Sequence, residues 1–272
     1  TVHGAYEMWS TAVKEGVKPI IGIEAYVTPE TARQDQTRVS WDTNWNPDID
    51  PQHRRRNPND VSGGGLITHL TMWAETDEGL VNLMKASTDA NLEGRVMRYP
   101  RMDKEILAKY SKGIIASSGC PSGIIQTRLL LGQFDEALRA AGELQDIFGR
   151  DNFYIEFMDH GLKIEKQVTD GLLDIAKKLN APLLATNDSH YVRAEDAGSQ
   201  DAMLCINSGS TLDEPGRFKF DGTGYYLKSA EEMRELFKDI PEACDNTLEI
   251  AERCNVMFDD HEDLSLIHIS EP

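Results

Sequence analysis

Five short stretches of the sequence each place a metal-binding type of side chain in or directly after an apolar segment. These stretches are "IIGIEAYV" with Glu24, "THLTMW" with His69, "SSGC" with Cys120, "MDHG" with Asp159 and His160, and "NDSHY" with Asp188 and His190. Carboxylate, imidazole and thiolate are the ligand types that zinc prefers, and carboxylate with imidazole also suits manganese. The pattern therefore predicts a site for divalent metal ions.

Each of these residues also has an ordinary structural explanation when it is taken alone. Glu24 could be a paired core carboxylate, although a buried carboxylate without a partner is costly. His69 could be a satisfied core histidine, and Cys120 could be a small buried residue. Asp188 could cap a helix or a turn. Taken together, metal-type ligands on five separate predicted strands favour a shared metal site.

The elements that must position these side chains alternate between strands and helices. Apolar, β-branched runs predict strands over 17–27, 66–75, 113–120, 152–161 and 181–191. Helical spacing of apolar residues predicts helices over 1–16, 76–94, 121–131, 134–148, 164–180, 194–207, 229–240 and 242–255. This alternation indicates an α/β protein with a mostly parallel sheet, in which functional residues gather at the carboxyl ends of the strands.

Three local patterns refine these expectations. Residues i and i+2 of a strand share a face, so Asp188 and His190 could bind the same ion or adjacent ions. Thr76 is expected to cap the helix over 76–94, with Glu78 in its first turn. The segment 41–65 is rich in Asn, Asp, Pro and Gly, which predicts a loop with His53 as an ordinary exposed histidine.

The bulk properties of the 272 residues exclude several classes of protein. Twenty-eight basic against 46 acidic residues give a net charge of −18, which disfavours non-specific binding of a phosphate backbone. No apolar run approaches the length of a membrane span, and no signal peptide is visible, so we expect a cytoplasmic protein. The four cysteines form no CxxC pair and are expected to be reduced, with Cys205, Cys244 and Cys254 in the core.

From Val17 to about Val256, the chain resembles the PHP (polymerase and histidinol phosphatase) domain of bacterial DNA polymerase III alpha subunits. The resemblance rests on "GVKPIIGIEAYVTP", "HLTMWAETDEGLVNLMKAS", "YPRMDKEILAKYSKGIIASSGCPSG", "FGRDNFYIEFMDHG" and "APLLATNDSHYVRAEDA". The wording "GCPSG" and "FKFD" is most similar to the actinobacterial type. The resemblance implies a distorted (β/α)₇ barrel of PHP type with up to three zinc or manganese ions at one mouth.

The same resemblance implies roles for particular residues. The metal ligands would be Glu24, His69, Cys120, Asp188 and His190, with Glu24 and Asp188 in catalytic roles. His160 matches a motif position of the family that is not a usual ligand, so it would support a ligand or contact the substrate.

The chain also departs from the family pattern in two places. It lacks the family's first strand with its His-x-His motif, and His3 in "TVHG" is out of register and is not expected to be a ligand. Ile124 stands where the family commonly has Glu, which affects a local polar contact. The chain has no initiator Met and opens within a predicted helix, so we expect that it starts inside a longer polypeptide. The expected division is 1–228 for the PHP domain, 229–263 for the helical start of the following polymerase region and 264–272 for a non-native tail.

The resemblance implies that the parent chain is a DNA-directed DNA polymerase and that this portion is a metal-dependent 3′→5′ proofreading exonuclease. Two alternatives remain open. The domain could be a metal-poor scaffold that stabilises the polymerase and docks a separate proofreading subunit, or a stand-alone phosphoesterase acting on a small phosphate monoester. The implied partners are primer–template DNA, bound through the full polymerase, and other replicase subunits such as the sliding clamp.

Overall fold

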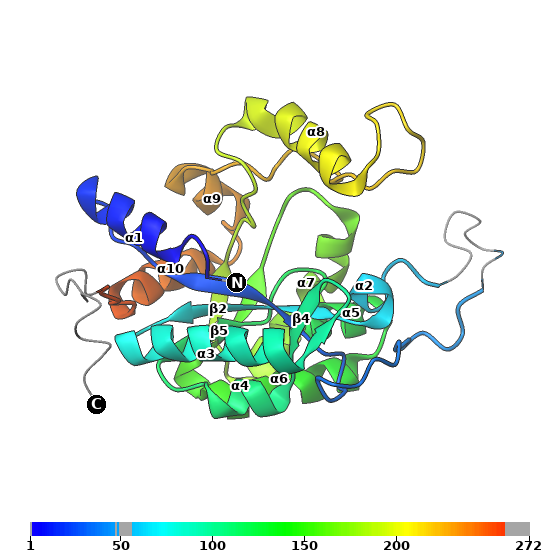
Figure 1. Cartoon of the computed structure of the whole chain (residues 1–272), viewed down its shortest axis with the longest axis horizontal. Helices are drawn as coiled ribbons and strands as arrows, with labels where there is room; N and C mark the ends of the chain where they lie inside the picture. The colour runs from blue at the N-terminus through cyan, green and yellow to red at the C-terminus, as the bar shows by residue number, and fades with distance from the viewer. Residues whose placement is uncertain (1, 47, 49–55, 259–272) are drawn as a thin grey trace, which may run out of the picture.

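The computed structural model describes residues 2–46, 48 and 56–258, which form a seven-stranded sheet with helices packed around it (Figure 1). The predictions for His53, for 259–263 and for the tail 264–272 lie outside the described residues. The strands are β1 (Gly22–Val27), β2 (Thr68–Ala74), β3 (Arg95–Val96), β4 (Tyr99–Met102), β5 (Ile114–Ser117), β6 (Phe153–Phe157) and β7 (Leu183–Ala185). Their order across the sheet is β3-β4-β1-β2-β5-β6-β7.

Most strands of this sheet run in one direction. Strand β1 is parallel to β4, and β5, β6 and β7 are parallel to one another. Strand β2 is antiparallel to both β1 and β5, so β1 and β5 also point the same way, while β3 is antiparallel to β4. The prediction of an α/β fold with a mostly parallel sheet is confirmed. The fold is consistent with a PHP-type barrel, although the sheet of the described residues is not closed and ends at β3 and β7.

The reversed direction of β2 brings its first residues to the edge where the neighbouring strands end. In the β1–β2 ladder, Val27 pairs with Thr68 and Tyr26 pairs with His69. The amino end of β2 therefore lies beside the carboxyl end of β1. Residues at the start of β2 can join a site built from the carboxyl ends of the other strands.

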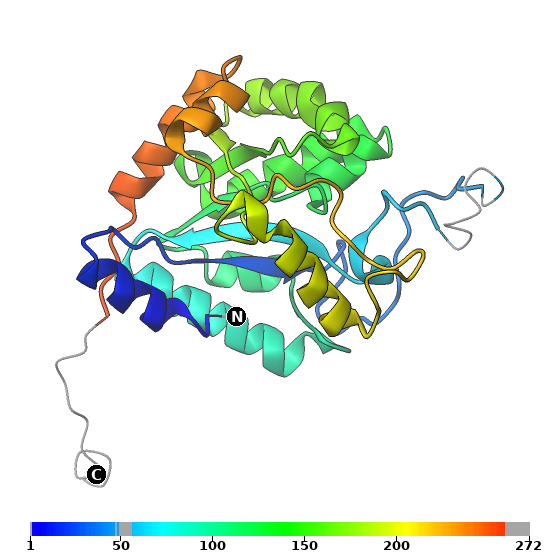
Figure 2. The ribbon, with the colours of Figure 1, turned by 90° about the horizontal axis from the view of Figure 1, so that it is seen from above.

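The helices form layers around the sheet. They are α1 (Ala5–Lys14), α2 (Ser62–Gly65), α3 (Asp77–Glu93), α4 (Lys104–Lys109), α5 (Ile124–Leu130), α6 (Phe134–Phe148), α7 (Lys163–Leu179), α8 (Ala197–Ser208), α9 (Ala230–Leu236) and α10 (Pro241–Arg253). Helices α3, α4 and α6 lie along the lower side of the sheet in Figure 1, and α8 and α9 lie on the opposite side. Figure 2, which looks onto that opposite side, shows α8 in front of the sheet.

Alternation along β1 and β2 separates core residues from exposed ones. Ile23 and Ala25 of β1 and Leu70 and Met72 of β2 are buried in the main apolar cluster. The intervening residues, including Glu24 and His69, remain partly open to solvent. Alternate residues of a strand point to opposite faces, so the same strands build the core and present polar groups.

Several expectations about individual elements are confirmed. Helix α6 has the predicted bounds, and Thr76 caps α3 by accepting a hydrogen bond from the backbone N–H of Gly79 at 3.2 Å. Cys205, Cys244 and Cys254 are buried and free. Among the described residues, none of the helices is long and apolar enough to cross a membrane.

Other expectations about elements are wrong. The first strand begins at Gly22 rather than at residue 17, and neither the β3–β4 hairpin nor α4 was predicted. Strand β7 ends at Ala185, so residues 186–190 are not part of a strand, and Asp188 has a φ of 43°. The prediction that Asp188 and His190 share a strand face is therefore wrong, because neither residue lies in a strand and the backbone turns at Asp188.

Candidate metal centre

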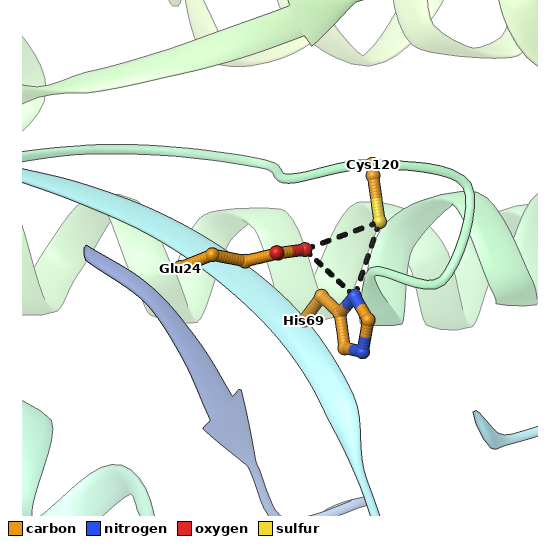
Figure 3. Close-up of side chains that lie close together, drawn as sticks. All are labelled: Glu24, His69 and Cys120. Atoms are coloured by element: carbon orange, nitrogen blue, oxygen red, sulfur yellow. Dashed lines mark hydrogen bonds and ion pairs between the residues drawn. The ribbon is translucent and has the colours of Figure 1, made fainter. Parts of the chain in front are cut away.

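Three of the predicted ligands converge at the carboxyl edge of the sheet (Figure 3). Glu24 comes from β1, His69 from the start of β2, and Cys120 from the turn after β5. His69 Nδ1 lies 2.8 Å from Glu24 Oε1, and Cys120 Sγ lies 3.3 Å from His69 Nδ1 and 3.7 Å from Glu24 Oε1. Within the part of the chain that is described, these three form the one group of at least three candidate ligands whose donor atoms all lie within 4.8 Å.

The backbone around the turn after β5 explains why Cys120 reaches the other two ligands. His69 donates its backbone N–H to the carbonyl of Ser122 at 3.1 Å, and Gly123 donates to the carbonyl of Cys120 at 2.7 Å. Gly119 has a φ of 81°, and a Cβ at this position would lie 2.8 Å from the backbone oxygen of His69. Glycine at this position lets the turn pack directly against the start of β2.

The spacing of the three donor atoms fits a single metal ion. A tetrahedral ion with ordinary zinc–ligand bonds separates its N, O and S ligand atoms by about 3.3–3.6 Å. The three distances in the structure, 2.8, 3.3 and 3.7 Å, lie close to this range. The side chains of His69 and Glu24 are 22% and 45% exposed, so the group is accessible from solvent. Small side-chain movements would bring these donors to metal-binding distances.

Electrostatics at the three ligands also favours a cation. The hydrogen bond to His69 outweighs burial and keeps the pKa of Glu24 below its ordinary value. Burial, followed by the negative charge of Glu24, raises the pKa of Cys120 well above that of a free thiol, and Asp188 adds to this. The thiolate form of Cys120 is therefore unfavourable unless a positive charge lies close to it. The donor set fits the zinc or manganese ion that the resemblance implies.

Asp188 and His190 lie together in the loop after β7. His190 Nδ1 is 3.7 Å from Asp188 Oδ1 and 2.7 Å from the backbone oxygen of Asp188. In the neutral ring, Nδ1–H donates to that backbone oxygen, which leaves the lone pair on Nε2 for a ligand. The negative charge of Asp188 contributes to the raised pKa of Cys120, and the negative charge of Glu24 contributes to the raised pKa of Asp188, so the pair and the three converging ligands are within electrostatic reach of one another. The structure thus brings the five predicted ligands to one region, as a compact group of three and a neighbouring pair.

His160 is placed differently from the predicted ligands. Its side chain is 2% exposed, its Nδ1 lies 2.5 Å from Glu165 Oε1, and its Nε2 lies 2.7 Å from the backbone oxygen of Asn187. Asn187 directly precedes Asp188, so His160 supports the loop that carries the Asp188–His190 pair. Neighbouring Asp159 accepts the backbone N–H of Gly161 at 2.8 Å and stabilises the turn after β6.

A segment after α8 fixes the other side of the same loop, which was not foreseen from the sequence. His190 donates its backbone N–H to Tyr225 at 2.8 Å, and Asn187 Nδ2 donates to the backbone oxygen of Tyr226 at 2.6 Å. Lys228 Nζ donates to Asn187 Oδ1 at 2.7 Å. The loop after β7 is therefore held between α7 and the segment 223–228. The only sequence signal was the cluster of tyrosines in "GTGYYLKS".

Glu156 is a second residue that was missed, although it stands in an apolar strand as Glu24 does. It is 2% exposed, accepts the hydroxyl of Ser117, accepts the backbone N–H of Gly119 at 3.0 Å, and accepts the hydroxyl of Thr186 at 2.6 Å. Burial raises its pKa, although these hydrogen bonds oppose the rise. Glu156 links the turn that carries Cys120 to the start of the loop that carries Asp188.

Comparison with known proteins identifies the family. The sequence profile of the PHP domain matches residues 1–160. Proteins named "DNA polymerase III subunit alpha" are similar over 253 residues, with 54% identity in Saccharopolyspora erythraea, 52% in Mycobacterium tuberculosis and 51% in Mycobacterium leprae. Each alignment covers 93% of this chain and 20–21% of the relative, so the chain spans about a fifth of the length of the curated relatives it matches. The chain belongs to the PHP domain family.

Proposed function

We propose that this chain is the PHP portion of a replicative DNA polymerase III alpha subunit and that it hydrolyses phosphodiester bonds as a metal-dependent 3′→5′ proofreading exonuclease. The observation that carries the proposal is the convergence of Glu24, His69 and Cys120 donors within 3.7 Å of one another. The names and the 51–54% identity of the actinobacterial relatives support the assignment to a polymerase subunit.

The proposed ligand set divides the work among the side chains. His69 and His190 would bind zinc or manganese as neutral imidazoles, and Cys120 would bind as a thiolate. A bound ion would supply a hydroxide nucleophile at neutral pH and stabilise charge on the leaving oxygen. Glu24 and Asp188 would provide the negative charge that keeps cations at this edge of the sheet. Burial raises the pKa of Asp188, so its carboxylate form also depends on a nearby positive charge.

The proposed domain boundaries, partners and location rest on the assignment of the chain to a polymerase subunit. We infer that residues 1–228 form the PHP domain, that residues 229–263 begin the next region, and that 264–272 are a non-native tail. Primer–template DNA and the sliding clamp would bind to the complete subunit, which would work in the cytoplasm. Polymerisation would be carried out by other parts of that subunit.

The test uses the complete subunit with a labelled primer that ends in a mismatched base. We expect the wild type to degrade the primer from its 3′ end and Asp188→Asn to do so at least about 100-fold more slowly, with polymerisation on a matched primer unchanged. Asp170→Asn, which changes an exposed carboxylate on α7, is the matched control and should behave as wild type.

Each alternative function has its own outcome in this assay. If neither wild type nor variant degrades the primer, while a separate nuclease subunit binds the complete protein, the domain is a scaffold. If the wild type releases phosphate from a small monoester but leaves DNA intact, it is a phosphoesterase.

A further inference from the structure

A row of aromatic rings leads away from the loop that carries Asp188 and His190. The buried ring of Tyr225 stacks on the ring of His160, with 4.1 Å between the ring centroids. The ring centroid of Phe220 lies 4.8 Å from that of Tyr225 and 4.7 Å from that of His190. Phe218 follows at 6.0 Å from Phe220 and is 63% exposed. The row thus begins in the interior beside a proposed metal ligand and ends at the surface.

A cavity lies directly beside this row. It has a volume of about 250 Å³ and is formed by the start of α8 on one side and by Tyr191 and 219–223 on the other. Tyr191 follows His190 in the chain, and its hydroxyl donates to the backbone oxygen of Thr223 at 2.8 Å, which fixes one wall of the cavity. Phe220 contributes to the lining as well, so one ring contacts both the cavity and the ring of His190.

We propose that this cavity receives the base of the unpaired 3′-terminal nucleotide while its phosphodiester lies at the proposed metal centre. The proposal rests on the proposed nuclease function and adds the part of the substrate that is recognised. A nucleobase is a flat ring that stacks on aromatic side chains whatever its sequence, which suits an enzyme that removes any mismatched base.

Polar groups of the cavity can contact the edge of a base. Gln200 and Lys219 line it, and the side chain of Gln200 makes no hydrogen bond to another described residue. Arg217, in contrast, is committed to a bidentate pair with Asp201, with both contacts at 2.6 Å. Lys219 is the one cationic residue among those that line the cavity, and the carboxylate of Asp201 lines it too, so the cavity offers little net positive charge to bind phosphate. Stacking of the base on aromatic rings, and not attraction of the DNA phosphates, would therefore account for most of the affinity of the cavity for the terminal nucleotide.

Occupation of the cavity would select mismatched ends. A paired terminal base must unpair and unstack before it can enter the cavity, and the free-energy cost of doing so is smallest for a mismatched base. The cavity would therefore discriminate between primer ends without reading their sequence.

The test measures kcat/KM of the complete subunit for two primers, one ending in a mismatched base and one ending in an abasic sugar. The wild type should have a higher kcat/KM for the primer that ends in a mismatched base than for the primer that ends in an abasic sugar. Phe220→Leu keeps an apolar side chain against Tyr225 but removes the aromatic face, and it should lower the base-to-abasic ratio at least about fivefold. Phe220→Tyr keeps an aromatic face and should show the wild-type ratio. Leu92→Ala, which removes an exposed apolar side chain from α3, should leave it unchanged.

A second measurement does not depend on catalysis. The Asp188→Asn subunit is irradiated with a primer whose 3′-terminal base is 5-iodouracil, and the adduct is mapped by mass spectrometry. We expect it on Phe220 or Tyr191. If the adduct forms only at other sites, or if wild type and Phe220→Leu have equal base-to-abasic ratios, the cavity does not bind the terminal base. Either result refutes this inference but does not contradict the proposed nuclease activity. Absence of all degradation instead defeats the proposed function, and the adduct still decides whether a base enters the cavity.

Discussion

His160 and Glu165 form a buried pair that links the turn after β6 to the start of α7. Glu165 accepts the backbone N–H of His160 at 2.8 Å, and its other oxygen lies 2.5 Å from His160 Nδ1. His160 Nε2 faces the backbone oxygen of Asn187, so both ring nitrogens face acceptors and both must carry a proton. Burial opposes this charge, but the bonds to Glu165 and Asn187 outweigh it and raise the pKa of His160.

Removal of the His160 ring should destabilise the chain. His160→Gln leaves the carboxylate of Glu165 buried without its charged partner, and breaking such a pair costs about 3–5 kcal/mol. We expect the free energy of unfolding of the 272-residue chain, measured in urea by tryptophan fluorescence, to fall by this amount. The exposed His3→Gln is the matched control. A loss below about 1 kcal/mol would show that the pair is not maintained in solution.

The same pair predicts how stability depends on pH. The pKa of His160 is raised above 6.5, so its contribution is complete below that pH and is lost as the pH rises through the raised value. The pKa of Glu165 is lowered below 4.5, because the contacts with His160 outweigh burial, so its contribution is present above that pH and is lost as the pH falls through the lowered value. The difference in unfolding free energy between wild type and His160→Gln should therefore be largest between about pH 4.5 and 6.5 and shrink above it. A difference that grows from pH 7 to 9 would contradict the charged state.

Glu156 is expected to support metal binding without being a ligand. Glu156→Ala removes the acceptor for Ser117, Gly119 and Thr186 and leaves their donors buried, so metal affinity should fall about 10- to 100-fold. Glu156→Gln keeps one acceptor oxygen and the side-chain volume, so its loss should be several-fold smaller. Competition with a chelator measures both affinities in the complete subunit. If Glu156→Ala and the wild type bind metal with equal affinity, Glu156 supports the fold and not metal binding.

Cys120 should decide which ion binds. Thiolate favours zinc, whereas manganese prefers carboxylate and imidazole. Cys120→Ser should therefore raise the dissociation constant for zinc at least about tenfold and change that for manganese much less. Thermal unfolding with each ion reports the binding, because a ligand at about 100 times its dissociation constant adds roughly 2.7 kcal/mol of stability. Unchanged zinc binding in Cys120→Ser would remove Cys120 from the ligand set.

Local sequence patterns predicted the elements that have a clear period or a clear end. Helix α6 shows regular apolar spacing. Thr76 is a preferred N-cap residue, and the acidic residues Asp77 and Glu78 that follow it are typical of the first turn of a helix. The β3–β4 hairpin was missed because its strands are very short and partly polar. Met97, which lies between them, adopts a φ of 54°, and a side chain of this type gives no signal for such a turn.

The site was predicted by residue type and not by geometry. Glu24, His69 and Cys120 were recognised as metal-type residues, but nothing in the local pattern showed that β2 runs against its neighbours and thereby places His69 beside Cys120. The buried partners of the ligand loops, such as Glu156, were missed because their hydrogen bonds join segments far apart in the sequence. Such contacts depend on the packing of the whole sheet.

The alternation along β1 and β2 has a consequence for inheritance. Ile23, Ala25 and Met72 fill the core, whereas Glu24 and His69 lie between core positions and contribute little to it. A substitution at either proposed ligand would therefore remove a metal-binding group without opening a cavity in the core. A lineage that loses the proposed metal site can therefore keep the same fold. Whether a relative keeps the proposed metal site must accordingly be judged from these two positions and not from the survival of the fold.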